Sequence, residues 1–218
     1  MRSPRPIDSR LVQRFDGEIC GFGTAAGVRV VIGRWTSSPF GAFADAMVEQ
    51  RDGRRCLIAP TAVVADLVGG VYDFDEIRIS EVVTSRTAGR LLFDGAPLHA
   101  DVMIGARDAL GWALRCVPRR LATSVTWARL LDPVVRRTMR GVRTSGRTVG
   151  ASETYGATDR RPVIAVEANW EGNDLGAMAD VDPAVRFGFG STPMRPSLVA
   201  VSTTIRPTRD PTTSKSNR

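Results

Sequence analysis

Asp45 is a lone carboxylate in an apolar run that directly follows the turn Ser-Pro-Phe-Gly at 38–41. The proline fixes its own φ angle and the glycine permits a backbone conformation that side chains disfavour, so we expect a rigid turn that enters a strand. On that strand, Asp45 should share a face with Phe43 and Met47. Because an unpaired carboxylate is costly on an apolar face, the pattern predicts that Asp45 is paired or acts as a general acid or base.

The other reactive side chains suggest less chemistry. Ser38 has neither a nucleophile-elbow context nor a histidine partner, so we expect it to hydrogen-bond within its turn. His99 is the only histidine, which excludes catalytic triads and multi-histidine metal sites. Cys20, Cys56 and Cys116 lie far apart in no metal-ligand or redox spacing and indicate a reducing compartment. We therefore expect no metal and no cofactor.

The basic balance of the chain does not indicate a nucleic-acid partner. The formal charge is +7, but only Lys215 among the 30 basic residues is lysine, a usage typical of a GC-rich bacterial genome. The arginines are spread along the whole chain with carboxylates between them, unlike a basic footprint. The N-terminus has no apolar core segment, and no run is long enough to span a bilayer. We expect a cytoplasmic protein without nucleic-acid or membrane partners, and leave homo-oligomers open.

Short alternating segments separated by Gly, Asn and Asp turns predict a sheet around Asp45. We expect a mainly β (α+β) fold: an antiparallel, closed or strongly curved β-barrel with one short helix and helical insertions. Residues 1–15 and 207–218 lack periodicity and are expected to be flexible, which leaves 16–206 as one domain. The expected strands are 18–24, 28–35, 43–49, 55–58, 76–84, 89–93, 97–104, 148–155, 162–170, 184–189 and 198–205, with helices at 61–68 and within 107–139.

The segment 38–45, Ser-Pro-Phe-Gly-Ala-Phe-Ala-Asp, resembles the acetoacetate decarboxylase-like family. That family carries Ser-Pro-x-Gly-Pro-Tyr, followed one residue later by Glu, at the start of a barrel strand. Ser, Pro and Gly are identical here, while Ala42, Phe43 and Asp45 replace Pro, Tyr and Glu. The helix at 61–68 falls where the family has its helix, and the strand order is compatible over 18–206. The resemblance implies a barrel with a small-molecule pocket.

The family's chemistry is not retained. Its decarboxylases use a lysine that forms a Schiff base with the keto acid, and such an amine must be desolvated to be nucleophilic. The sole lysine, Lys215, lies in the C-terminal tail, and the family's Gly-x-Pro-Lys stretch is replaced by Gly-Val-Tyr-Asp-Phe-Asp at 70–75. We therefore predict that acetoacetate decarboxylase activity is absent.

Three functions stay open. The first is binding of a small anionic or keto-acid-like molecule through Arg34, Ser38, Asp45 and Tyr72, which the resemblance and the carboxylate together suggest. The second is non-covalent lyase, isomerase or hydrolase chemistry with Asp45 as general acid or base. The third is a structural or interaction protein whose barrel is filled by side chains.

Overall fold

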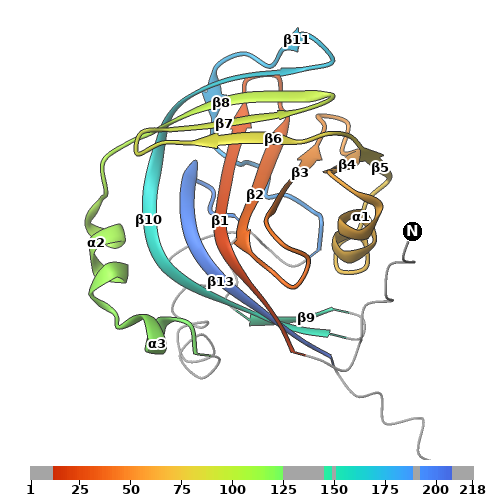
Figure 1. Ribbon diagram of the computed structural model, residues 1–218. Coiled ribbons are helices and arrows are strands. Elements are labelled where there is room, and N and C mark those ends of the chain that lie inside the picture. The colour runs from red at the N-terminus through yellow and green to blue at the C-terminus, as the bar shows by residue number, and fades with distance from the viewer. Residues whose placement is uncertain (1–11, 125–144, 149–150, 189–191, 208–218) are drawn as a thin grey trace, which may run out of the picture.

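A computed structural model describes residues 12–124, 145–148, 151–188 and 192–207, which form a mainly β fold (Figure 1). The sheet curls into a half-barrel with the strand order β5-β4-β3-β2-β1-β13-β10-β8-β7-β6. The strands are β1 (Gln13–Thr24), β2 (Arg29–Ser37), β3 (Phe43–Glu49), β4 (Arg55–Ala59), β5 (Glu76–Ile79), β6 (Val83–Arg86), β7 (Arg90–Gly95), β8 (Leu98–Ile104), β9 (Ser145–Thr148), β10 (Ala151–Trp170), β11 (Asn173–Asp174), β12 (Met178–Ala179) and β13 (Ser197–Pro207). The helices are α1 (Ala62–Gly69), α2 (Ala109–Cys116) and α3 (Arg119–Ala122).

The prediction of a mainly β, strongly curved sheet is confirmed, but the sheet is mixed rather than purely antiparallel. β4 and β5 pair in parallel, because α1 between them carries the chain back to the end of the sheet where β4 began. β5 and β6 stand at the two ends of the strand order although only residues 80–82 separate them in sequence. The predicted single strand 76–84 is therefore split between the two sheet edges.

Each central strand has two buried faces, which we name after Cys20 and Asp45. On the Cys20 face, β7 and β8 lie across the N-terminal strands and pack Leu91, Phe93 and Leu98 into the main core. On the Asp45 face, α1 and the loop around Phe187 cover the sheet. Side chains alternate between these faces along the central strands, so neighbouring residues belong to different environments.

Helix α1 confirms the helix predicted at 61–68. The Thr61 side chain caps it by accepting a hydrogen bond from the Val64 N–H at 3.3 Å. Its buried residues join Leu57 on the Asp45 face. Beyond the helix end, the Tyr72 N–H donates to the Val68 carbonyl at 3.0 Å, which holds Tyr72 beside the sheet.

Several element boundaries differ from the predictions. β1 begins at Gln13, inside the N-terminal stretch 1–15 for which we expect flexibility, while residues 1–11 and 208–218 lie outside the described residues. The predicted strands 148–155 and 162–170 are largely parts of the single strand β10. Pro162 lies within β10, just beyond the last residue that pairs with β8, and still pairs with Ser197 of β13.

Two further expectations are corrected. The stretch predicted as a strand at 184–189 is irregular over 184–188, because the Arg186 N–H donates to the buried Glu49 carboxylate at 2.7 Å and not to a neighbouring strand. The helical insertion expected at 107–139 contains α2 and α3, separated near Pro118, whereas 125–139 lies outside the described residues. Within the described part of the chain, no helix combines the length and apolarity needed to cross a membrane.

Candidate functional site

Asp45 lies at the buried centre of the Asp45 face. It shares that face with Phe43 and Met47, as predicted, and is 3% exposed. The Trp35 indole Nε1–H donates to Asp45 Oδ1 at 3.0 Å. Burial raises the pKa of Asp45 to about 7, although the hydrogen bond from Trp35 works in the opposite direction. Asp45 is therefore divided between its protonated and ionised forms near neutral pH.

Gly33 makes the pairing of Asp45 and Trp35 possible. It lies directly opposite Asp45 in the β2–β3 ladder. A Cβ atom at this position would lie 2.7 Å from Asp45 Oδ1 and 2.8 Å from Trp35 Nε1. The absence of a side chain thus lets the carboxyl and the indole meet over the strand.

Next to Trp35 lies a small pocket, which we call the aromatic pocket. It is bounded by the sheet, the end of α1 and the segment that follows α1, and has a volume of about 50 Å³. That volume suits roughly three or four water molecules or a compact organic molecule. Its walls are Phe15, Trp35, Phe43, Leu67, Val68, Val71, Tyr72, Tyr155, Thr203 and Ile205.

The polar groups at the walls of the aromatic pocket include three hydroxyls. The hydroxyls of Tyr72 and Tyr155 hydrogen-bond to each other. Thr203 is 3% exposed, and its Oγ1 has no hydrogen-bond partner in the described structure. None of the described residues that line the pocket is charged, since Asp45 stands behind Trp35. The pocket therefore offers neutral hydrogen-bonding groups in an apolar setting.

The four predicted binding residues do not form one site. Asp45 and Tyr72 are on the same face, the first behind the aromatic pocket and the second in its wall. Ser38 stays in its turn, where its Oγ accepts from the Phe40 N–H at 3.0 Å and donates to the Gly41 carbonyl. The Phe40 ring in turn stacks against Phe15 at 6.4 Å, so Ser38 shapes the turn beside the pocket.

Arg34 does not lie at the mouth of this pocket with Asp45. It pairs with Ala44, one position away from Asp45, and therefore points to the Cys20 face. There it approaches Glu18 at 3.7 Å and lines a second hollow. The expectation of an arginine beside Asp45 is thus wrong, because the two residues occupy opposite sides of the sheet.

The sequence reasoning missed most of the pocket wall. Trp35 and Phe43 could have been found from the two-residue period around Asp45 and Gly33. Tyr155 and Thr203 had no such signal, because only the pairing of β10 with β13 brings them together with β1.

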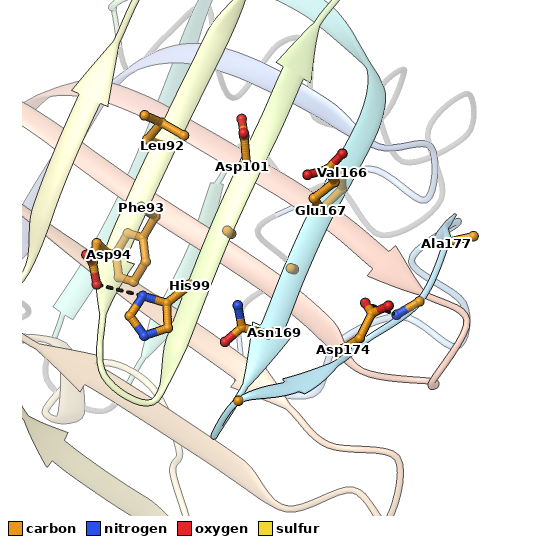
Figure 2. Close-up of a pocket in the computed structure, with 14 residues that line it drawn as sticks. Leu92, Phe93, Asp94, His99, Asp101, Val166, Glu167, Asn169, Asp174 and Ala177 are labelled. Atoms are coloured by element: carbon orange, nitrogen blue, oxygen red, sulfur yellow. Dashed lines mark hydrogen bonds and ion pairs between the residues drawn. The ribbon is translucent and has the colours of Figure 1, made fainter.

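A larger, open hollow of about 900 Å³ lies over the solvent-facing side of β7, β8 and β10 (Figure 2). Asp101 and Glu167 stand directly opposite each other there. His99, which is about half exposed, lies 2.7 Å from Asp94. Among the described residues no group of three or more His, Cys, Asp or Glu side chains could hold a metal ion. We interpret this hollow as a solvated acidic surface.

A comparison with protein-family models finds no match for this chain, and neither does one with curated proteins. Among solved structures, the chain is similar to a protein from Nitrosomonas europaea with the provisional name AttH, at 9% sequence identity and a TM-score of 0.29. The match covers 97% of this chain and 57% of that protein, so the chain spans little more than half its length. A similarity of this degree carries no inference about function.

Proposed function

We propose that this protein binds a small carbonyl compound in the aromatic pocket. The observation that carries the proposal is the buried Thr203 hydroxyl, which has no hydrogen-bond partner among the described residues and lines an apolar pocket. A buried hydroxyl without a hydrogen bond is destabilising, and a ligand carbonyl would satisfy it. The adjacent hydroxyls of Tyr72 and Tyr155 supply a second hydrogen-bonding point, while the rings of Trp35 and Phe43 cover the carbon skeleton.

The keto part of the expected keto-acid ligand fits this pocket better than the acid part. A carboxylate entering it would lose water without gaining a cation from the described lining residues. A ketone loses less on desolvation and needs only a donor. The turn at 38–41 and the strand with Asp45, which resemble the acetoacetate decarboxylase-like family, stand beside this pocket and support a ligand site there.

Schiff-base decarboxylation is proposed to be absent. The sole lysine, Lys215, lies outside the described residues, and no lysine is among the described residues that line the pocket. Purified protein should release no carbon dioxide from acetoacetate above the spontaneous rate. Borohydride treatment should trap no adduct, and a lysine adduct would overturn this part of the proposal.

Binding can be followed through Trp35, one of four tryptophans, whose indole N–H signal is assigned with the variant Trp35→Phe. We expect butan-2-one to shift this signal in an NMR titration and acetoacetate, the same carbon frame with a carboxylate, to shift it much less. Thr203→Val should weaken butan-2-one binding several-fold, by roughly 1 kcal/mol. Ser202→Ala removes a hydroxyl on the other face of the same strand and should leave binding unchanged. Absence of any ketone-dependent shift would refute the proposal.

A second candidate is acid or base catalysis by Asp45, favoured by its pKa of about 7. Asp45 reaches the pocket only through Trp35, so a substrate would have to displace the indole to meet it. In Asp45→Asn, an enzyme would lose turnover of any converted ketone while still binding it. If neither butan-2-one nor acetoacetate binds, the structural or interaction role that we left open is favoured. The packed hydrophobic core on the Cys20 face is compatible with that role.

The cytoplasmic location likewise stays a proposal. Cys20, Cys56 and Cys116 are all unpaired in the structure, which fits a reducing compartment.

A further inference from the structure

A second hollow lies on the Cys20 face, on the opposite side of the strands that form the aromatic pocket. We call it the arginine hollow. It has a volume of about 590 Å³ and opens between β1, β2, β10 and the segment that joins α2 to α3. Its charged lining consists of Arg34, Arg115, Arg119, Asp16, Glu18 and Asp159.

The three carboxylates do not neutralise the three lining arginines, because each has a closer partner outside the hollow. These outer pairs are Arg14–Asp16 at 3.1 Å, Arg86–Glu18 at 3.1 Å and Arg107–Asp159 at 2.7 Å. The lining arginines are held more weakly. Arg34 and Arg119 approach their carboxylates only to 3.7 Å, and Arg115 has no ion pair within the described part of the chain.

Two of the carboxylates, Asp16 and Asp159, have lowered pKa values. Desolvation alone would raise the pKa of Asp16, but hydrogen bonds from Arg14 and the charges of Arg14 and Arg119 bring it below its usual value. The pKa of Asp159 is lowered in the same way, with the Arg107 guanidinium outweighing desolvation. At formal charge, the six arginines and three carboxylates named here leave an excess of three positive charges among the described residues around the hollow.

The excess positive charge around the arginine hollow lies partly on side chains that are not fully exposed to water. Glu18 is shared between Arg34 and Arg86, whose side chains are only 29% and 14% exposed. A partly buried guanidinium that lacks a carboxylate of its own carries a desolvation cost, which a bound anion would offset. Arg34 extends from the β-sheet and not from a loop, so its position is fixed before a ligand arrives.

We infer that the arginine hollow binds a small molecule carrying two or more oxyanion groups, phosphate or carboxylate. The guanidinium group matches both groups with paired N–H donors, and three surplus charges favour a multivalent anion over a monovalent one. This site is independent of the ketone proposal, since its residues face the other side of the sheet. The anionic ligand expected for Arg34 is thus assigned to a different pocket from that of Asp45.

The test is calorimetric titration of the full chain with pyrophosphate and with citrate, at constant ionic strength set by potassium chloride. We expect at least one probe to bind, and the choice between them distinguishes phosphate from carboxylate ligands. Arg34→Gln should weaken binding roughly tenfold or more, as should the double change Arg115→Gln and Arg119→Gln, because charged hydrogen bonds are lost.

Arg90→Gln is the matched control, since Arg90 pairs with Asp101 at the acidic surface and lies away from the arginine hollow. It should bind the probe as the unchanged protein does. If neither probe binds, or if Arg90→Gln weakens binding as much as Arg34→Gln, the proposal is overturned. The Trp35 indole signal and the unfolding midpoint confirm folding of each variant. The exposed pair 115 and 119 keeps the test valid if Arg34→Gln does not fold.

Discussion

The aromatic pocket and the arginine hollow are built on the same strands, β1 and β2, yet they provide opposite environments. Trp35 lines the first and Arg34, the preceding residue, lines the second. The two environments differ because different segments pack over the two faces of the sheet. Helix α1 and Tyr72 close the Asp45 face with apolar side chains, whereas the region near α3 leaves the Cys20 face open to water at this end.

The pKa values of two aspartates, Asp45 and Asp16, reflect this difference between the two faces. Asp45 on the closed face has a raised pKa, because desolvation outweighs its one neutral hydrogen bond. Asp16 on the open face has a lowered pKa, because the guanidinium groups of Arg14 and Arg119 outweigh desolvation. The same side chain is thus made a weak acid on one side of a sheet and a stronger acid on the other.

The largest expected effect comes from the pH dependence of stability and from Asp45→Asn. Because the pKa of Asp45 rises from 3.8 to about 7 on folding, its contribution is fully present below pH 4 and is lost as the pH rises to 7. The loss amounts to roughly 4 kcal/mol in the free energy of unfolding. Asp45→Asn should remove this dependence in urea titrations between pH 4 and 8, and should be more stable than the unchanged protein at pH 8.

Asp16→Asn is the opposing control for that prediction. Its lowered pKa means that Asp16 stabilises the fold above its unfolded pKa, and that this contribution is lost as the pH falls through the folded pKa. Asp16→Asn should therefore destabilise the protein at neutral pH. If the two variants shifted stability in the same direction at pH 8, the contrast between the faces would be wrong.

Gly33→Ala should give the next largest effect. The new Cβ would press on both the carboxyl oxygen of Asp45 and the indole nitrogen of Trp35, so we expect a loss of about 1–3 kcal/mol in the free energy of unfolding. Gly89→Ala is matched to it, because a Cβ there would meet its nearest atom at 3.9 Å. Equal stability of the two variants would contradict the tight approach described for Asp45.

Trp35→Phe should act on the acid itself. It keeps an aromatic ring in the pocket wall but removes the N–H that stabilises the ionised carboxyl of Asp45. The pKa of Asp45, followed by carbon NMR of the carboxyl group, should rise above about 7. A fall in this pKa would mean that another group, not desolvation, controls Asp45.

Thr203→Val should have the smallest effect on the unliganded protein. The Thr203 hydroxyl is buried and has no hydrogen-bond partner in the part of the chain that the structure describes. Its replacement by a methyl group of similar shape is expected to leave stability unchanged or to raise it by up to about 1 kcal/mol. A clear loss of stability in urea unfolding would show that the hydroxyl already has a partner and would weaken the case for a ligand carbonyl.

Local signals in the sequence were enough to predict the rigid turn, the helix at 61–68 and the face that Asp45 shares with Phe43. Each of these depends on residues close together in the chain. The pairing register of β2 and β3 could not be predicted from such local signals. Arg34 and Asp45 were predicted to bind one ligand, and only the Gly33–Asp45 pairing reveals that they point in opposite directions.

Long-range pairing explains the remaining misses. Tyr155 and Thr203 enter the aromatic pocket because β13 lies between β1 and β10, an order that no local pattern encodes. Similarly, Arg115 lies on α2 and Arg119 on α3, and charged residues on short helices usually form a solvated face. Their role in the arginine hollow depends on how the chain after β8 returns beside β10.

Residues 80–82 connect β5 and β6, the two edge strands of the sheet, although no hydrogen-bonded ladder joins these strands. Since β5 ends at Ile79 and β6 begins at Val83, the two rims can separate there by no more than roughly 14 Å, the reach of a fully stretched chain over four steps. The covalent backbone thus holds the two edges of the curled sheet near each other. It limits how far the curl can relax, and so preserves the curvature that gives both hollows their shape.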